Sequence, residues 1–302
     1  DQTLADAVQN SCNPAFIQIG KNMGIENFQN YFEAFGLTEK TGVDLPGESG
    51  SLFYTADQLN LTELATESFG QNFSLTPLQM ITAVSAVANG GTLLEPHIVK
   101  EVLNADGTVA QSYGRTEVRQ VISAETSETM REMLESVVKV GTGKNAYVAG
   151  YRVAGKTGTA QQDLRRSNHA LFIGFAPYEN PELVIYCIVD EPNSEEQDHS
   201  YYAQNICREI LKEVLPYMNI YQDEELTGVN SGLGITGEPV EQLERIIKSE
   251  KTDAIDIGKS LVTMGISLGI MMKALNAMPT NKAFATNLFG LTEPTNLIQS
   301  VI

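Results

Sequence analysis

The sequence predicts an α+β fold in which helices flank an antiparallel sheet. Three strand-like segments follow one another at residues 151–161, 170–176 and 183–189, and helical patterns lie before and after them rather than between them. Strands in direct succession pair antiparallel, because a parallel pair needs a long crossover between its strands. The third segment is nearly all apolar, which predicts a central place in the sheet.

The first part of the chain predicts a series of helices. Residues 3–10 have the pattern of the end of a helix, and Pro14 suits the first position of a second helix over 14–23 that Gly24 ends. A third helix over 25–35 has an aromatic stripe that we expect to face the core. The stripe consists of Phe28, Tyr31, Phe32 and Phe35. Gly and Pro residues then predict a long loop over 37–52.

The middle and end of the predicted domain have clear start and stop signals. Thr76 and Pro77 open a helix that reaches residue 87, and Ser123 caps another that reaches about residue 138. Between them, segments 96–103 and 108–113 flank an Asp-Gly turn and predict a hairpin. A last helix over 201–214 is expected to stop at Pro216.

Composition excludes several classes of function. The net charge is −18, which argues against a nucleic-acid surface and against adsorption to anionic lipid, since both need clustered Lys and Arg. Three widely spaced cysteines support neither a disulfide framework nor a zinc site. No histidine has the spacing of a metal ligand, so we predict no metal and no cofactor. The residues concerned are Cys12, Cys187, Cys207, His97, His169 and His199.

The chain also lacks a recognisable targeting segment. Its first residues contain no basic stretch, and its longest weakly polar run, residues 260–272, is shorter than the roughly 20 residues that span a bilayer as a helix. We expect any membrane anchor to lie in sequence upstream of Asp1.

Two short motifs carry the chemistry. Lys156-Thr157-Gly158 lies on the first predicted strand, and Ser11-Cys12-Asn13 lies at a junction between helices. K-T-G and S-x-N are two of the three elements of a serine acyl-transfer site. On a strand edge, the lysine would face a substrate carboxylate, the glycine would admit a substrate backbone, and the N–H of Thr159 would donate to an oxyanion.

Each motif also has a structural interpretation. A lone K-T-G is a polar turn on an edge strand, and Asn13 followed by proline is typical of a helix start. The functional interpretation gives Ser11 a proton-relay role and lets Asn13 hydrogen-bond a substrate amide. Residues 150–157 also match the P-loop pattern G-x-x-x-x-G-K-T, with an acidic end on the strand over 183–189. Nucleotide binding would require a helix directly after Thr157, and the polar segment that follows does not predict one.

The third element of the acyl-transfer site, S-x-x-K, holds the nucleophile and should precede S-x-N. The chain contains one such pattern, from Ser136 to Lys139, but it is downstream of S-x-N on a predicted helix. We interpret both residues as helix surface and expect the nucleophile to lie outside these 302 residues.

Longer stretches resemble the transpeptidase domain of class B penicillin-binding proteins of the septal and sporulation types. They are SCNPAFIQIG (11–20), KTGVDLPGE (40–48), SFGQ (68–71), TPLQM (76–80) and GYRVAGKTGTAQ (150–161), in the family's order. The resemblance covers residues 1–218, which we predict to be the C-terminal part of such a domain, incomplete at its N-terminus. A second K-T-G at Lys40 lies in a loop, and the family's triplet aligns with Lys156.

The resemblance implies D,D-transpeptidation of peptidoglycan stem peptides through a serine acyl-enzyme, with covalent inhibition by β-lactams. It assigns catalysis to Ser11, Asn13 and Lys156, and substrate binding to Thr157, Gly158 and Thr159. It places the protein at the extracytoplasmic face of the bacterial membrane, with divisome or elongation proteins as partners. It also implies that the strands completing the sheet are missing, which predicts an open sheet edge.

Other functions stay open at this point. A non-catalytic domain that binds stem peptides or division partners would keep the same motifs, and an S-x-x-K encoded upstream would favour the enzyme instead. A β-lactamase or β-lactam sensor also shares the motifs, but the long similarity favours the transpeptidases. Residues 219–302 form a C-terminal extension of unknown role.

Overall fold

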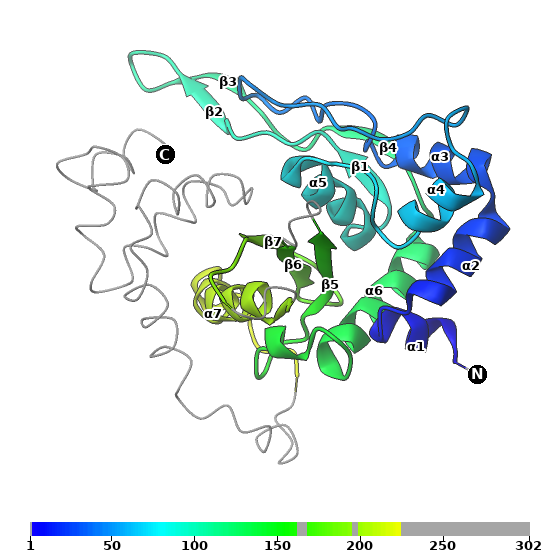
Figure 1. Ribbon diagram of the computed structural model, residues 1–302. Coiled ribbons are helices and arrows are strands. Elements are labelled where there is room, and N and C mark those ends of the chain that lie inside the picture. The colour runs from blue at the N-terminus through cyan, green and yellow to red at the C-terminus, as the bar shows by residue number, and fades with distance from the viewer. Residues whose placement is uncertain (1, 162–167, 195–198, 225–302) are drawn as a thin grey trace.

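A three-stranded antiparallel sheet lies at the centre of the computed structural model, which describes residues 2–161, 168–194 and 199–224 (Figure 1). Its strands are β5 (Ala154–Gln161), β6 (Asn168–Ala176) and β7 (Leu183–Asp190), in the order β5-β6-β7. The predicted α+β class and antiparallel pairing are confirmed. The first strand starts at Ala154 rather than Tyr151, which instead makes an isolated bridge with Val148.

Helices cover the two faces of this sheet. Helix α7 (Tyr201–Tyr217) packs against β6 and β7, while α6 (Ala124–Lys139) packs on β5 and α5 (Pro77–Ala88) packs on β7 (Figure 1). The core between α7 and the sheet includes Phe172, Cys187 and Cys207, each at most 1% exposed. Cys187 and Cys207 are therefore small residues of the core.

Strand β7 differs from the prediction of a central strand. Within the described ranges it pairs only with β6, so it lies at an edge. Its apolar sequence follows from helices on both faces rather than from strands on both sides. The open edge that the resemblance implied is present in this part of the chain.

Two glycines let β5 and β6 approach an aromatic ring. Gly155 and Gly174 are register partners, and the fully buried ring of Phe172 lies beside both. A Cβ on Gly155 would come within 2.5 Å of that ring, and one on Gly174 within 2.8 Å of it. Real side chains do not tolerate such distances, so these positions keep the start of β5 tightly packed.

The N-terminal part forms α1 (Leu4–Gln9), α2 (Asn13–Met23), α3 (Ile25–Ala34) and α4 (Leu61–Glu67). Helices α1 to α3 were predicted, and Gly24 ends α2 with φ of 78°. Helix α4 was missed, although Asn60 and Glu63 form a capping box at its start. The aromatic stripe of α3 is only half-buried, and Tyr31 is 47% exposed, so its assignment to the core was wrong for that residue.

The predicted caps and the predicted hairpin are confirmed. Thr76 caps α5 with Pro77 in the first turn, and the Ser123 hydroxyl accepts the Thr126 N–H at the start of α6. Strands β2 (Glu101–Leu103) and β3 (Val109–Ser112) pair antiparallel and form an arm that projects from the body (Figure 1). Both are shorter than predicted and fully exposed.

Two short strands and one helix end were not predicted correctly. Strands β1 (Thr92–Leu94) and β4 (Glu117–Gln120) pair beside α5, but three or four residues give little periodicity to detect. Helix α7 continues through Pro216 to Tyr217. Pro216 removes one N–H bond in the last turn of the helix, but the Met218 N–H still donates to the Val214 carbonyl at 2.9 Å.

Candidate active site

The two predicted motifs meet in space. The Lys156 Nζ donates to the Ser11 Oγ at 2.9 Å, across a sequence separation of 145 residues. The same Nζ also reaches the Thr157 carbonyl at 3.0 Å. The lysine of K-T-G and the serine of S-x-N are therefore in direct contact, although 145 residues separate them in the sequence.

Ser11 is held by the tight turn between α1 and α2. Its φ is 51°, a left-handed value that is uncommon for a residue with a side chain, and its N–H donates to the Val8 carbonyl at 3.2 Å. The next residue, Cys12, donates its N–H to Ala7 and is the N-cap of α2. The turn therefore directs the Ser11 hydroxyl toward β5 at the cost of backbone strain, a combination found often at functional sites.

The ammonium of Lys156 is largely shielded from water. Burial lowers its pKa from 10.5 to about 8. At pH 7 the group is still mostly protonated, roughly nine molecules in ten. A partly desolvated cation beside a hydroxyl is suited to binding a substrate carboxylate and to exchanging a proton with Ser11.

The hydroxyl of Thr157 has a partner that the sequence did not single out. Its Oγ1 lies 2.9 Å from the Thr142 Oγ1, in the loop after α6. The Thr142 N–H in turn donates to the Gln9 carbonyl at 3.0 Å, at the end of α1. Thr142 thus joins the turn that carries Ser11 to the strand that carries Lys156. Its only sequence signal was a position between two glycines after a helix.

A second residue that the sequence analysis missed contacts Thr159, which directly follows the triplet. The Gln71 Nε2 donates to the Thr159 carbonyl at 3.2 Å. Gln71 belongs to the quoted stretch SFGQ, which was noted for its resemblance and not for a contact. Asn13 is exposed at the first position of α2, and its placement next to Ser11 agrees with the motif spacing.

Strand β5 presents the triplet at a sheet edge. Among the described residues it pairs only with β6, with Lys156 opposite Ile173 and Gly158 opposite Leu171. A Cβ on Gly158 would come within 2.4 Å of the end of the Leu171 side chain, so that side chain would have to move to admit one. The edge facing away from β6 is free of any strand within the described ranges.

The structure contradicts the P-loop alternative. Lys156 and Thr157 lie inside β5, which continues to Gln161, whereas a P-loop would bend at the lysine and start a helix there. The other serine and lysine pair is also unsuited to a nucleophile. The Ser136 hydroxyl is half-buried and donates to the Met133 carbonyl at 2.6 Å, while Lys139 is exposed.

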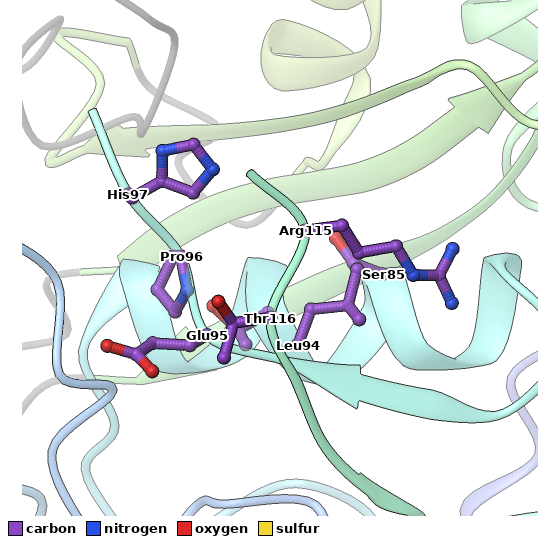
Figure 2. Close-up of a pocket in the computed structure, with 8 residues that line it drawn as sticks. Ser85, Leu94, Glu95, Pro96, His97, Arg115 and Thr116 are labelled. Atoms are coloured by element: carbon purple, nitrogen blue, oxygen red, sulfur yellow. The ribbon is translucent and has the colours of Figure 1, made fainter. Parts of the chain in front are cut away.

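A cavity of about 380 Å³ lies away from this site, between α5, β1 and the segment before β4. Figure 2 shows Leu94 and Pro96 at its wall and Arg115 at its rim. Ser11 and Thr142, the described residues whose side chains hydrogen-bond to Lys156 and Thr157, do not line it. In the part of the chain that the structure describes, no cluster of His, Cys, Asp and Glu could hold a metal ion, and no helix is long and apolar enough to cross a membrane.

Comparison with known protein families identifies the family of this chain. The penicillin binding protein transpeptidase domain matches residues 1–212. The chain belongs to this family. The resemblance predicted from the motifs is therefore confirmed for this transpeptidase domain.

Individual relatives agree. Stage V sporulation protein D of Bacillus subtilis is 38% identical over 288 residues, covering 90% of this chain and 44% of the relative. Penicillin-binding protein PbpB of Mycolicibacterium smegmatis is 38% identical over 200 residues, covering 60% of this chain and 30% of the relative. The chain thus spans less than half the length of these relatives. The first alignment covers more of the chain than residues 1–218 comprise, so it extends into the segment that the resemblance had left unmatched.

Solved structures lead to the same family. Penicillin binding protein 3 of Mycobacterium tuberculosis, complexed with ampicillin, matches with a TM-score of 0.68 at 32% identity, over 74% of this chain and 53% of that one. The transpeptidase domain of Burkholderia pseudomallei penicillin-binding protein 3 matches with a TM-score of 0.66 at 31% identity, over 74% of this chain and 66% of that one.

Proposed function

We propose that this transpeptidase domain supplies the S-x-N and K-T-G elements of a peptidoglycan D,D-transpeptidase. The reaction is cross-linking of stem peptides through a serine acyl-enzyme, and β-lactams are covalent inhibitors. The nucleophile comes from an S-x-x-K segment outside these 302 residues. The observation that supports this proposal most directly is the contact of 2.9 Å between Lys156 Nζ and Ser11 Oγ.

In this proposal Ser11 relays the proton. The attacking serine must lose a proton as it acylates, and the leaving amine must gain one. The Ser11 hydroxyl can accept the proton of the attacking serine while it passes its own proton to the leaving amine. The Lys156 ammonium, with a pKa of about 8, holds the Ser11 oxygen in place through its hydrogen bond. Asn13, two residues after Ser11, hydrogen-bonds an amide of the bound peptide.

Strand β5 binds the substrate. A stem peptide that lies along the free edge would pair with backbone groups of the strand, and Gly158 leaves room for it. The peptide carboxylate faces the Lys156 ammonium and the hydroxyls of Thr157 and Thr159. The Thr159 N–H donates to the oxyanion of the tetrahedral intermediate, an interaction that typically contributes roughly 10²-fold or more to the rate.

The location and partners follow from the same proposal. Stem peptides lie outside the cytoplasm, so the site works at the extracytoplasmic face of the membrane, with an anchor in the remainder of the protein. The name of the sporulation relative supports a place in sporulation, with septal and elongation assemblies as the alternatives. Divisome or elongation proteins are the proposed partners. The division into residues 1–218 and an extension over 219–302 stays a prediction.

The test is the intact mass of two proteins with and without a β-lactam. One is the 302-residue chain, and the other is the longer protein with the sequence encoded upstream of Asp1. We expect one drug mass on the longer protein and none on the shorter chain. An adduct on the shorter chain would place the nucleophile within it, at Ser136 or Ser11. A longer protein that binds stem peptides but takes up no drug would instead be the non-catalytic binding domain.

A further inference from the structure

Residues 219–224, which we call the strap, follow α7 and pack against the loop that leads into β5. The family match ends at residue 212, so the strap lies outside the matched domain. Its target is the turn over residues 147–152, which directly precedes the strand of Lys156. The chain after Glu224 continues from this point.

Backbone hydrogen bonds fix the centre of the contact. The N–H groups of Asp223 and Glu224 donate to the Gly150 carbonyl at 3.0 and 3.2 Å. The Asp223 carboxylate accepts the Arg152 N–H at 2.7 Å. Gly150 has φ of 87°, and a Cβ there would come within 2.6 Å of the Gln222 side chain. The turn is therefore shaped to receive the strap.

Side chains hold both ends of the strap. The Tyr147 hydroxyl donates to the Glu224 Oε2 at 2.7 Å, and Lys139 lies 3.4 Å from the other oxygen of the same carboxylate. The Glu224 side chain is only 10% exposed, whereas that of Lys139 is 52% exposed. At the other end, the buried Tyr151 hydroxyl donates to the Ile220 carbonyl at 3.1 Å. Four residues of the turn thus contact the strap: Tyr147, Gly150, Tyr151 and Arg152.

The path from the strap to the active strand is short. Arg152, which Asp223 holds by its N–H, lies two residues before β5 and four before Lys156, about 13 Å along an extended chain. The Arg152 guanidinium also binds Glu135 of α6 through two contacts of 2.7 and 3.0 Å. Arg152 therefore binds the strap through its backbone N–H and binds α6 through its side chain.

We propose that the strap is a positioning element for the active strand: Asp223 and Glu224 fix the start of β5, and so fix Lys156 against Ser11. This inference rests on the proposed function only in taking Lys156 as the active lysine. The strap is also the first part of the predicted extension over residues 219–302, so its contacts join that extension to the turn before β5.

The test uses the whole 302-residue chain and four single variants. Asp223→Ala and Tyr147→Phe each remove one strap bond. Asp223→Asn keeps an oxygen that can accept the Arg152 N–H, and Lys139→Ala removes only the exposed partner of Glu224. The two measurements are amide hydrogen exchange over β5 and NMR titration of Lys156 in lysine-labelled protein, with the signal assigned from Lys156→Arg.

We expect Asp223→Ala and Tyr147→Phe to speed exchange at residues 152–156 roughly tenfold, with β7 unchanged. The pKa of Lys156 should rise from about 8 toward its ordinary value, because a looser strand admits water. Asp223→Asn and Lys139→Ala should match the parent. Unchanged exchange and titration in Asp223→Ala and Tyr147→Phe would overturn the proposal. An equal loss of exchange protection in all four variants would also overturn it. Neither measurement needs a β-lactam, so failure of the proposed function would not be mistaken for failure of the strap.

Discussion

The chain contains the triplet K-T-G twice, and the two copies lie in different surroundings. Lys40-Thr41-Gly42 lies in a loop, with Lys40 exposed and Gly42 at φ of 80°. The Thr41 N–H and hydroxyl both donate to the Glu48 Oε1 at 2.7 Å. Lys156-Thr157-Gly158 lies on an edge strand, with its lysine shielded and in contact with Ser11.

The difference shows which features turn three residues into a site. In the first copy, one carboxylate binds the polar groups of Thr41 and Gly42, so the triplet closes a loop. In the second copy, the lysine donates to the Ser11 hydroxyl and to the Thr157 carbonyl, and no carboxylate within the described ranges binds it. The same three residue types therefore form a loop in one place and a candidate site in another. The burial of the lysine and the partners of the triplet distinguish the two.

The largest expected difference between the copies is in drug acylation. In the longer protein, Lys156→Ala should reduce β-lactam labelling by about 100-fold or more, because it removes both the cation and the partner of Ser11. Lys40→Ala is the matched control and should label like the parent. Fluorescent penicillin labelling followed over time measures both. Equal labelling in the two variants would show that the assignment of the second triplet is wrong.

A buried glutamate elsewhere in the chain contrasts with Glu48 in its expected dependence on pH. Unlike Glu48, Glu67 at the end of α4 is 3% exposed, and neither of its oxygens has a hydrogen-bond partner among the described residues. Burial raises its pKa to about 7, and the nearby Tyr54 N–H offsets only part of the rise. Below pH 4.5 both the folded and unfolded states are neutral here. Stability is lost as the pH rises from 4.5 to 7, by about 3 kcal/mol in all.

Glu67→Gln should therefore raise the free energy of unfolding by up to about 3 kcal/mol at pH 8 and change it little at pH 4. Urea unfolding at the two pH values measures the difference. A gain of the same size at both pH values would mean that packing, not charge, explains the effect.

Breaking the first triplet should cost stability without affecting the site. Glu48→Ala removes the acceptor of three donors, from Thr41 and Gly42, at 2.7 to 3.3 Å. Bonds to a charged group are each worth about 1.5–3 kcal/mol, and partial exposure puts the expected loss at about 2 kcal/mol. Chemical denaturation measures this loss. β-Lactam labelling of the longer protein should stay at the parent rate, and a slower rate would indicate that this loop reaches the site.

The glycines of the two triplets should respond in opposite ways. Gly42→Ala forces a left-handed φ on alanine and should cost about 1 kcal/mol of stability with normal labelling. Gly158→Ala meets only the tip of the Leu171 side chain, which can rotate, so its cost in stability should be smaller. Its Cβ should instead slow labelling. The contrast fails if Gly158→Ala labels at the parent rate.

Much of this architecture could be predicted because its signals are local. Capping residues predicted the starts of two helices, at Thr76 with Pro77 and at Ser123. The Asp-Gly turn predicted the hairpin arm. The motifs also singled out Ser11 and Lys156, and the structure places these two side chains in contact. What failed depended on neighbours distant in sequence: the edge position of β7, and the exposure of Tyr31 on a stripe with the right spacing.

The remaining contacts of the site are of the same distant kind. Gln71 reaches Thr159 across 88 residues, and Thr142 reaches Thr157 through a loop whose shape the sequence does not reveal. The strap is also invisible before folding, because Asp223 and Glu224 look like a solvated acidic patch. Each of these residues is of a polar type that is common on protein surfaces. Only its partner in the folded structure distinguishes it from an ordinary surface residue.

The turn that carries Ser11 also contains a cysteine that can be labelled. Cys12 is partly exposed, whereas Cys187 and Cys207 are buried in the core. A thiol-reactive fluorophore or spin label should therefore modify the native protein at one position, directly adjacent to Ser11. The structure thus provides a single-site reporter of ligand arrival without the introduction or removal of any residue.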